Sequence, residues 1–203
     1  MLAAGRIGEL GPIGPADLVI AADGGSGHAA ALGLGIDVIV GDLDSIEPGV
    51  LQSAEAAGAA VERHDADKDA TDLALALDAA MARGAARITV LGVGGGRADH
   101  HLANVLLLAS AEYADVEMDA WVDGSLLAVV HRHREIDVGE GATVTLLPVG
   151  GPAVGVRTSG LRWPLSGDTL TPGTSRGVSN VALMPMIEVE VGSGTLLAVI
   201  TPA

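Results

Sequence analysis

The chain has 203 residues, of which 49% are hydrophobic, and its 26 acidic against 11 basic residues give a formal net charge of −15. This acidity argues against nucleic acid as a partner, because duplex binding rests on neutralising phosphates with basic side chains. The chain has no cysteine, which excludes disulfides and a thiol nucleophile. Apolar runs stay short of the ~20 residues of a membrane helix, and the opening "MLAAGRIGEL" is too short in apolar residues for a signal peptide. We therefore expect a cytoplasmic protein with no membrane partner.

Up to about residue 115, predicted strands alternate with predicted helices. The strands are apolar runs without strict alternation, which is typical of parallel strands buried on both faces. They are expected at residues 17–22, 35–41, 58–64, 86–93 and 115–122. Such alternation predicts an α/β N-terminal domain with a mainly parallel sheet flanked by helices.

Two of the intervening helices have clear signals. The first, at 71–84, has leucines at four-residue spacing, Thr71 or Asp69 as a possible N-cap, and Gly84 as its expected end. The second, at 98–110, has an apolar face formed by Leu102, Val105, Leu106 and Ala109. Both helices follow loops rich in charged residues.

After about residue 123 the helical periodicity disappears. In "MIEVEV" (186–191) three aliphatic residues alternate with Glu188 and Glu190, and Gly- and Pro-rich turns separate short runs of this kind. This pattern predicts an antiparallel sandwich or barrel. We therefore expect two domains, at residues 1–123 and 124–203.

Acidic residues follow four of the predicted parallel strands. Because ligands bind beyond the carboxyl ends of such strands, the four loops are expected to meet at one edge of the sheet. The acidic residues expected to meet there are Asp23, Asp42, Asp44, Asp67, Asp69, Asp72 and Asp99.

Carboxylates that converge repel one another unless a cation lies between them, and oxygen-rich sites suit Mg²⁺, which also takes phosphate oxygens as ligands. The acidic loops therefore predict a magnesium site that binds a polyphosphate. Glycine backbones near Gly24 would let N–H groups approach phosphate, and Lys68 and Arg97 would add positive charge.

Each motif alone has a simpler explanation. An Asp-x-Asp turn after a strand is often merely solvated, and Asp69 and Asp72 suit a helix start. "GVGGGR" lacks the final glycine of a dinucleotide-binding loop, and no Walker loop is present. "HRHR" (131–134) could suggest a metal, but the polarity of an exposed strand explains it better. The coincidence of four acidic loops is what favours a site.

Four segments in the first half, "AADGG", "GDLDS", "DKDATDLALAL" and "GGGRADHHLANVLLL", resemble in this order the catalytic half of the thiamine pyrophosphokinase family. In the second half, "GLRWPL" and "SRGVSN" are similar to the family's thiamine-binding half. The resemblance covers roughly residues 17–182. It implies an α/β domain followed by a β-sandwich, and a homodimer with the active site between the subunits. It also implies Mg²⁺-dependent transfer of a pyrophosphoryl group from ATP to thiamine, with AMP as the second product.

The resemblance also implies roles for individual residues. Those implied to bind metal are Asp42, Asp44 and Asp69. Those implied to be catalytic are Asp44, Asp69, Asp72, Arg97 and Asp99. Those implied to bind the nucleotide are Asp23, Gly24, Asp67, Lys68, Thr71 and Arg97. Those implied to bind thiamine are Asp99, Asn104, Trp163, Ser179 and Asn180.

Trp163 has a physical argument of its own. The chain has only three aromatic residues besides histidine, and thiamine is flat and cationic, so a tryptophan face would attract it. The simpler explanation is that Trp163 anchors the core of the second half. The start of the chain departs most from the family, and we expect its first strand to be reduced to "MLAAG".

Three alternatives remain open at this point. The acceptor could be another alcohol, such as a hydroxymethylpterin. Water could replace the acceptor, which would make the protein a hydrolase. The chain could also be a catalytically silent module that binds nucleotide or thiamine. Measuring AMP and thiamine diphosphate after incubation with ATP, Mg²⁺ and thiamine separates them.

Overall fold

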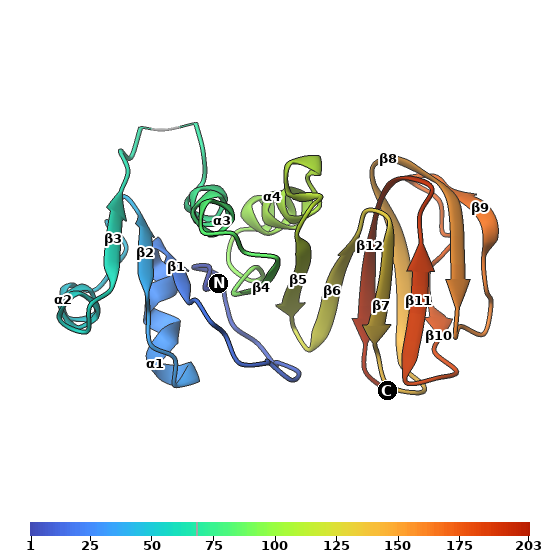
Figure 1. Ribbon diagram of the computed structural model, residues 1–203, viewed down its shortest axis with the longest axis horizontal. Coiled ribbons are helices and arrows are strands. Elements are labelled where there is room, and N and C mark those ends of the chain that lie inside the picture. Colours follow the sequence, from blue (N-terminus) through green and yellow to red (C-terminus); the bar gives the residue numbers. More distant parts are fainter. Residues whose placement is uncertain (68) are drawn as a thin grey trace.

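A computed structural model describes every residue of the chain except Lys68. The molecule is elongated, with a helix-covered part at one end and an all-β part at the other (Figure 1). No helix among the described residues is long and apolar enough to cross a membrane.

The first half contains a small parallel sheet. Its strands are β1 (Ile20–Ala22), β2 (Val38–Gly41) and β3 (Ala60–Arg63), paired in that order. Every residue of β1 and β2 is buried, whereas β3 lies at the edge and is partly exposed. The unalternating apolar runs of the sequence therefore predicted these buried strands correctly.

A short N-terminal segment joins this sheet to the next strands. Leu2 forms parallel bridges to Ala21 in β1 and to Leu91 in β4 (Arg87–Leu91), and β4 pairs in parallel with β5 (Glu117–Val122). The Leu2 amide donates to the Ile20 carbonyl at 2.8 Å. The predicted reduction of the first strand to "MLAAG" is confirmed. All these strands run in parallel, so their carboxyl ends share one edge.

Helices connect the parallel strands. They are η1 (Asp23–His28), α1 (Ala29–Leu32), α2 (Pro48–Ala56), α3 (Asp72–Ala82), α4 (Ala98–Leu108) and η2 (Ala111–Tyr113). Helix α3 packs the buried Leu73 and Leu77 into the main core of this half. Thr71 is its N-cap, and Gly84 follows its end with a φ of 77°, a backbone conformation that favours glycine. The predicted end of this helix is confirmed.

Helix α4 differs from its sequence pattern. Leu102 and Leu106, which share the predicted apolar face, are 62% and 58% exposed. Leu108 is the one residue of the helix that is fully buried. Periodicity reports which residues share a face, but it does not report what that face contacts. Helix α4 therefore presents aliphatic side chains to the surface.

The second half is a larger, curled mixed sheet. It continues from β4 and β5 through β6 (Ser125–Val130), and Asp123 and Gly124 form the two-residue turn of the β5–β6 hairpin. Both turn residues have positive φ, as a type I′ turn requires. From β6 onward the pairs are antiparallel, as predicted, but the parallel pair β4–β5 belongs to the same sheet. The sheet is mixed for that reason.

The remaining strands enclose a second hydrophobic core. They are β7 (His133–Asp137), β8 (Thr143–Ser159), β9 (Ser166–Leu170), β10 (Asn180–Val181), β11 (Met186–Glu190) and β12 (Ser193–Thr201). The order is β6-β12-β8-β11-β7, with β9 and β10 also paired to β8. Ile187 and Val189 point inward, and the two glutamates between and beyond them point outward, as the alternating sequence predicted.

A partly buried ion-pair network connects β7 to β5. Arg134 of β7 donates to Asp119 Oδ1 at 2.8 Å and to Glu117 Oε1 at 2.7 Å, and its side chain is only 11% exposed. Burial alone would raise the pKa of Glu117, but the hydrogen bond from Arg87 and the charges of Arg134 and Arg87 outweigh it and lower the pKa. The network therefore holds the edge strand β7 of the second half against a strand of the first half.

We predict that Arg134→Met destabilises the protein by roughly 3 kcal/mol, because it leaves Asp119 without its cation and Glu117 with Arg87 alone. The free energy of unfolding from urea titration is the measurement. Arg132→Met is the matched control, since Arg132 is exposed in the turn between β6 and β7. We expect it to change the free energy of unfolding by less than about 0.5 kcal/mol. Equal effects of the two substitutions would contradict a specific role for Arg134.

Candidate active site

Three carboxylates meet at the carboxyl edge of the parallel sheet. Asp23 directly follows β1, Asp42 directly follows β2, and Asp72 is the first residue of α3. One carboxylate oxygen from each lies within 4.8 Å of the other two. The strand order brings the first two together, and the packing of α3 on the sheet adds the third. We call Asp23, Asp42 and Asp72 the acidic cluster.

Asp23 is the most constrained member of the acidic cluster. It is 6% exposed, and its Oδ1 is buried without a hydrogen-bond partner among the described residues. Its φ of 42° lies in a region that residues other than glycine rarely adopt. Burying a carboxylate oxygen without a partner is costly, whereas a divalent cation would satisfy it. The donor set therefore fits a hard cation such as Mg²⁺.

Gly41, the last residue of β2, makes room for the acidic cluster. A Cβ at this position would lie 2.9 Å from the Cβ of Asp23 and 3.2 Å from Oδ1 of Asp72, and the φ of Gly41 is 150°. Any side chain here would push two of the three acids apart. Our interpretation of the sequence did not include Gly41, although its place between a strand and Asp42 was a usable signal.

The turn after β2 orients Asp42. The amide of Asp44 donates to Asp42 Oδ1 at 3.3 Å, and the hydroxyl of Ser45 donates to Asp44 Oδ1 at 2.8 Å. Leu43, between the two acids, has a φ of 66°. Asp44 itself is exposed and lies outside the acidic cluster. The two acids of "GDLDS" therefore occupy different environments.

The loop before α3 holds more of the residues that the sequence indicated. Asp67 and Asp69 are exposed, and neither belongs to the acidic cluster. The hydroxyl of Thr71 accepts a hydrogen bond from the amide of Ala74 at 3.2 Å, so its oxygen caps the helix. Lys68, which we expected to add positive charge here, lies outside the described residues.

The loops after β1 and β4 supply further candidates at the same edge. Gly24 lies against the β2 turn, since a Cβ there would be 3.5 Å from the Cβ of Ser45. Arg97 donates to Asp99 at 2.6 Å and 3.2 Å, and both side chains are exposed. The hydrogen bond from Arg97 lowers the pKa of Asp99 to about 2. Asn104, further along α4, is half-buried.

A pocket of about 300 Å³ lies in the second half of the chain. Its lining residues are Leu146, Trp163, Pro164, Leu165, Arg176, Gly177, Val178 and Asn180. Trp163 is 57% exposed, so its indole lies on the surface and is not an anchor of the core. The guanidinium carbon of Arg162 lies 5.2 Å from the centre of the Trp163 ring, which is the geometry of a cation–π contact.

Asn180 holds the backbone of Trp163 in place. Its Oδ1 accepts from the Trp163 amide at 3.1 Å, and its Nδ2 donates to the Trp163 carbonyl at 2.7 Å. The neighbouring Ser179 has a φ of 58°, and its amide donates to the hydroxyl of Thr145 at 3.0 Å. The side-chain amide of Asn180 thus positions Trp163 through the Trp163 backbone, and Ser179 belongs to the turn next to Asn180.

The acidic cluster and the Trp163 pocket lie in different parts of the molecule. The acids are attached to β1, β2 and α3, whereas the pocket is built around β8 and β10 (Figure 1). Along the longest axis of the chain, the first set of elements lies in the helix-covered part and the second set lies in the all-β part. The structure therefore brings three of the predicted acids together, and separately brings Trp163 and Asn180 together.

The fold and the sites define a class of protein: a small parallel sheet with an acidic edge, followed by a curled mixed sheet with an aromatic pocket. Within this class, the family model "Thiamin pyrophosphokinase, catalytic domain" matches residues 13–119, and "Thiamin pyrophosphokinase, vitamin B1 binding domain" matches residues 129–196. The chain belongs to the thiamine pyrophosphokinase family.

Individual relatives agree with this assignment. Thiamine pyrophosphokinase 2 of Arabidopsis thaliana is 33% identical over 79% of this chain, and thiamine pyrophosphokinase of Bacillus subtilis is 29% identical over 69%. The chain spans 63% and 66% of the lengths of these two relatives.

Two solved structures share the fold. The crystal structure of the Bacillus subtilis enzyme has a TM-score of 0.78 at 24% identity, covering 91% of this chain and 87% of that one. Thiamin pyrophosphokinase from Candida albicans has a TM-score of 0.75 at 17% identity, covering 91% and 81%. The two-part architecture is therefore common to these proteins.

We predict that Gly41→Ala lowers the free energy of unfolding by roughly 1–3 kcal/mol and weakens Mg²⁺ binding, because the new methyl group displaces Asp23 and strains the backbone. Urea titration with and without Mg²⁺ measures both effects. Gly35→Ala, just before the same strand, is the control, since nothing lies within 4 Å of a Cβ there. An alanine tolerated equally at both positions would contradict this role of Gly41.

Proposed function

We propose that the protein transfers the pyrophosphoryl group of ATP to the hydroxyl of thiamine, giving thiamine diphosphate and AMP. The observation that carries the proposal is the acidic cluster, with its buried and unpartnered Asp23 oxygen, in a chain of the thiamine pyrophosphokinase family. In this reaction the thiamine oxygen forms a bond to the β-phosphorus, the bond between that phosphorus and the AMP oxygen breaks, and the hydroxyl proton leaves to a base or to water.

Mg²⁺ fits the acidic cluster and would be held by Asp23, Asp42 and Asp72. When bound, it would neutralise charge on the phosphoryl oxygens. Asp44 and Asp69 are exposed and lie two and three residues from Asp42 and Asp72 in the sequence, and they would extend the predicted metal site toward solvent. Three fixed carboxylates also repel a triphosphate without its cation, so the chain itself makes nucleotide binding depend on the ion.

The phosphate chain would be positioned by the loops around the acidic cluster. Gly24 has no side chain to obstruct a phosphate, and Arg97 is an exposed guanidinium that can donate two parallel hydrogen bonds. Arg97 is paired with Asp99, so we infer that it turns from this carboxylate to phosphate oxygens when nucleotide binds. Asp99 and Asn104 would then be available for the acceptor.

Thiamine would bind at the Trp163 pocket. The Arg162 guanidinium already lies on the indole face, which is evidence that this face attracts a cation. A thiazolium ring carries the same charge and adds a flat surface for stacking. Asn180 would act by holding the Trp163 backbone, with both ends of its amide engaged there.

We further propose a homodimer in which the acidic cluster of one chain faces the Trp163 pocket of the other. This proposal is supported by the separation of the two sites along the longest axis of one chain (Figure 1). The proposed domains are 1–123 and 124–203, the second being a β-sandwich that begins at the turn of the β5–β6 hairpin. We place the enzyme in the cytoplasm, where ATP is available.

An assay with ATP, Mg²⁺ and thiamine tests the proposed reaction. We expect AMP and thiamine diphosphate in equal amounts. Turnover with a hydroxymethylpterin instead of thiamine would identify another acceptor. Phosphate release that needs no acceptor would identify a hydrolase, and binding without turnover would identify a silent module.

We predict that Asp42→Asn or Asp72→Asn lowers kcat by about a hundredfold or more while leaving the fold intact, because each removes charge that holds the ion opposite the reacting phosphates. Steady-state kinetics with circular dichroism measures both. A shift of the Mg²⁺ dependence to higher concentration is the accompanying signature. Near-normal turnover with unchanged Mg²⁺ dependence would remove the cluster from the mechanism.

The same measurement on Asp44→Asn and Asp69→Asn tests the acids that lie outside the cluster. We expect losses of about a hundredfold or more here too, from the loss of charge beside the phosphates. Near-normal turnover in both variants would confine the metal site to Asp23, Asp42 and Asp72.

We predict that Asp42→Asn and Trp163→Ala complement each other when coexpressed. A mixed dimer has one site with both defects and one site with neither, so random pairing should restore roughly a quarter of wild-type turnover at low thiamine concentration. Each variant expressed alone is the control. Activity that never exceeds the sum of the separate variants would contradict a site shared between chains.

A further inference from the structure

The "HRHR" motif has a partner that the sequence pattern did not indicate. Strand β7 begins at His133 and pairs antiparallel with β11, so His133 lies directly opposite Glu190 and two residue pairs along from Glu188. Glu188 and Glu190 lie on the outward face of β11, and His133 lies on the same face of β7. The register therefore places an imidazole between two carboxylates on a rigid sheet surface.

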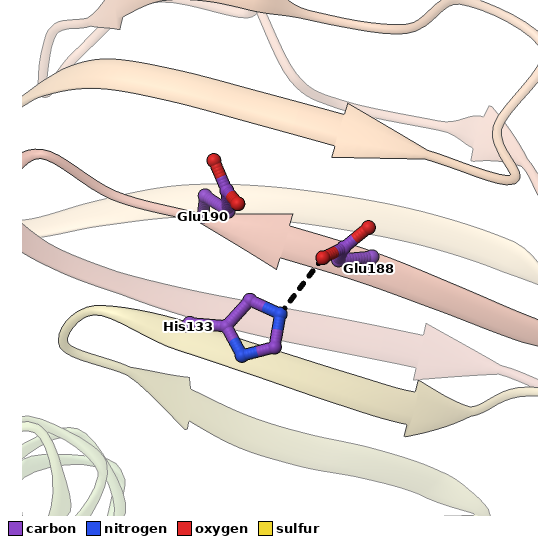
Figure 2. Close-up of side chains that lie close together, drawn as sticks. All are labelled: His133, Glu188 and Glu190. Atoms are coloured by element: carbon purple, nitrogen blue, oxygen red, sulfur yellow. Dashed lines mark hydrogen bonds and ion pairs between the residues drawn. The ribbon is translucent and has the colours of Figure 1, made fainter.

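Figure 2 shows how these three side chains lie. The Nε2 atom of His133 is 2.9 Å from Oε1 of Glu188. One ligand atom from each of His133, Glu188 and Glu190 lies within 4.8 Å of the other two. Small side-chain rotations would therefore bring all three onto one ion. Together with the acidic cluster, this is one of two such groups among the described residues.

The neighbouring residues leave the group available to a cation. The hydroxyl of Ser159 donates to Oε2 of Glu188 at 3.2 Å, which orients that carboxylate while its other oxygen faces His133. Arg157 lies opposite Glu190 in the register, but its guanidinium extends toward Gly167 of β9. In the part of the chain that the structure describes, Glu190 has no ion pair. A pocket of about 210 Å³ is lined by both glutamates together with Arg157, Thr158 and Ser159.

We propose that His133, Glu188 and Glu190 form a second metal site, which binds a transition-metal dication such as Zn²⁺. One imidazole nitrogen and two carboxylates are ligands that Zn²⁺ accepts, and water can complete its coordination in the adjoining pocket. Mg²⁺ prefers oxygen ligands alone, so the imidazole separates this site chemically from the acidic cluster. The proposal does not depend on the proposed enzymatic reaction.

The site would connect the terminal strand of the curled sheet to its neighbour. Strand β7 is the last in the order and pairs only with β11 among the named strands. Arg134, which follows His133 in β7, points to the opposite face and makes the ion pairs to β5. An ion held between β7 and β11 would therefore stabilise the strand that carries the junction network. Binding of an ion to the folded state alone raises the midpoint of thermal unfolding.

Calorimetric titration with Zn²⁺ in the presence of excess Mg²⁺, which competes at the acidic cluster, tests the proposal on the full chain. We expect one Zn²⁺ per chain. His133→Asn, Glu188→Gln and Glu190→Gln should each weaken binding by roughly tenfold or more. The visible spectrum of bound Co²⁺ should change in His133→Asn, which reports the imidazole ligand directly. Zn²⁺ at a hundred times Kd should raise the wild-type Tm by roughly 5–10 °C.

Glu135→Gln is the matched control. Glu135 lies opposite Glu188 in the register and is exposed, but it does not belong to the group. It should bind Zn²⁺ as the wild type does, and all variants should keep the metal-free Tm. No Zn²⁺ binding by the wild type would overturn the proposal, as would unchanged affinity in His133→Asn. Equal weakening by Glu135→Gln would also overturn it, since that result indicates only general attraction to an acidic surface.

Discussion

Electrostatic repulsion between carboxylates is the constraint around which the first half of the molecule is built. Two like charges about 5 Å apart repel by roughly 3 kcal/mol at an effective dielectric constant of 20. The positive φ of Asp23 and the absence of a side chain at Gly41 let the acids approach one another, and the N-terminus of α3 next to Asp72 offsets part of the repulsion. The helix dipole favours a negative charge at that terminus. A divalent cation bound by the acids would reduce their repulsion further.

The connection between the halves is equally local. Hydrogen bonds run from β1 through Leu2 to β4, and then through β5 into the antiparallel strands. Arg134 adds a partly buried contact across this path. The composition of the chain changes near residue 123, but the hydrogen bonding between strands continues past this point. The reason is that a two-residue hairpin turn, which keeps β5 and β6 paired, lies where the composition changes.

Much of this was predictable because local patterns carried it. Buried parallel strands have unalternating apolar runs, and the alternation in 186–191 separated Ile187 and Val189 from the glutamates correctly. Thr71 and Gly84 marked the ends of α3 through their own chemistry. These features depend on neighbours in sequence, and a pattern reports such neighbours directly.

The rest depended on neighbours that only the folded chain provides. The sequence placed seven acids at one sheet edge, but it could not distinguish the clustered Asp72 from the exposed Asp44 and Asp69. It indicated the shared face of Leu102 and Leu106 but not its exposure. It showed "HRHR" and "MIEVEV" without the register that sets His133 against Glu190. Strand register and helix orientation are long-range properties, and a single sequence contains no direct signal for either.

The hairpin turn at Asp123 and Gly124 has a mechanical consequence. A tight turn between paired strands offers no hinge, so one half of the chain has little freedom to fold over onto the other. Two sites in different halves of such a chain do not meet by bending. If nucleotide and acceptor meet only between two chains, the rate of catalysis depends on the protein concentration. Dilution that separates the dimer would then abolish turnover, although each chain remains fully folded.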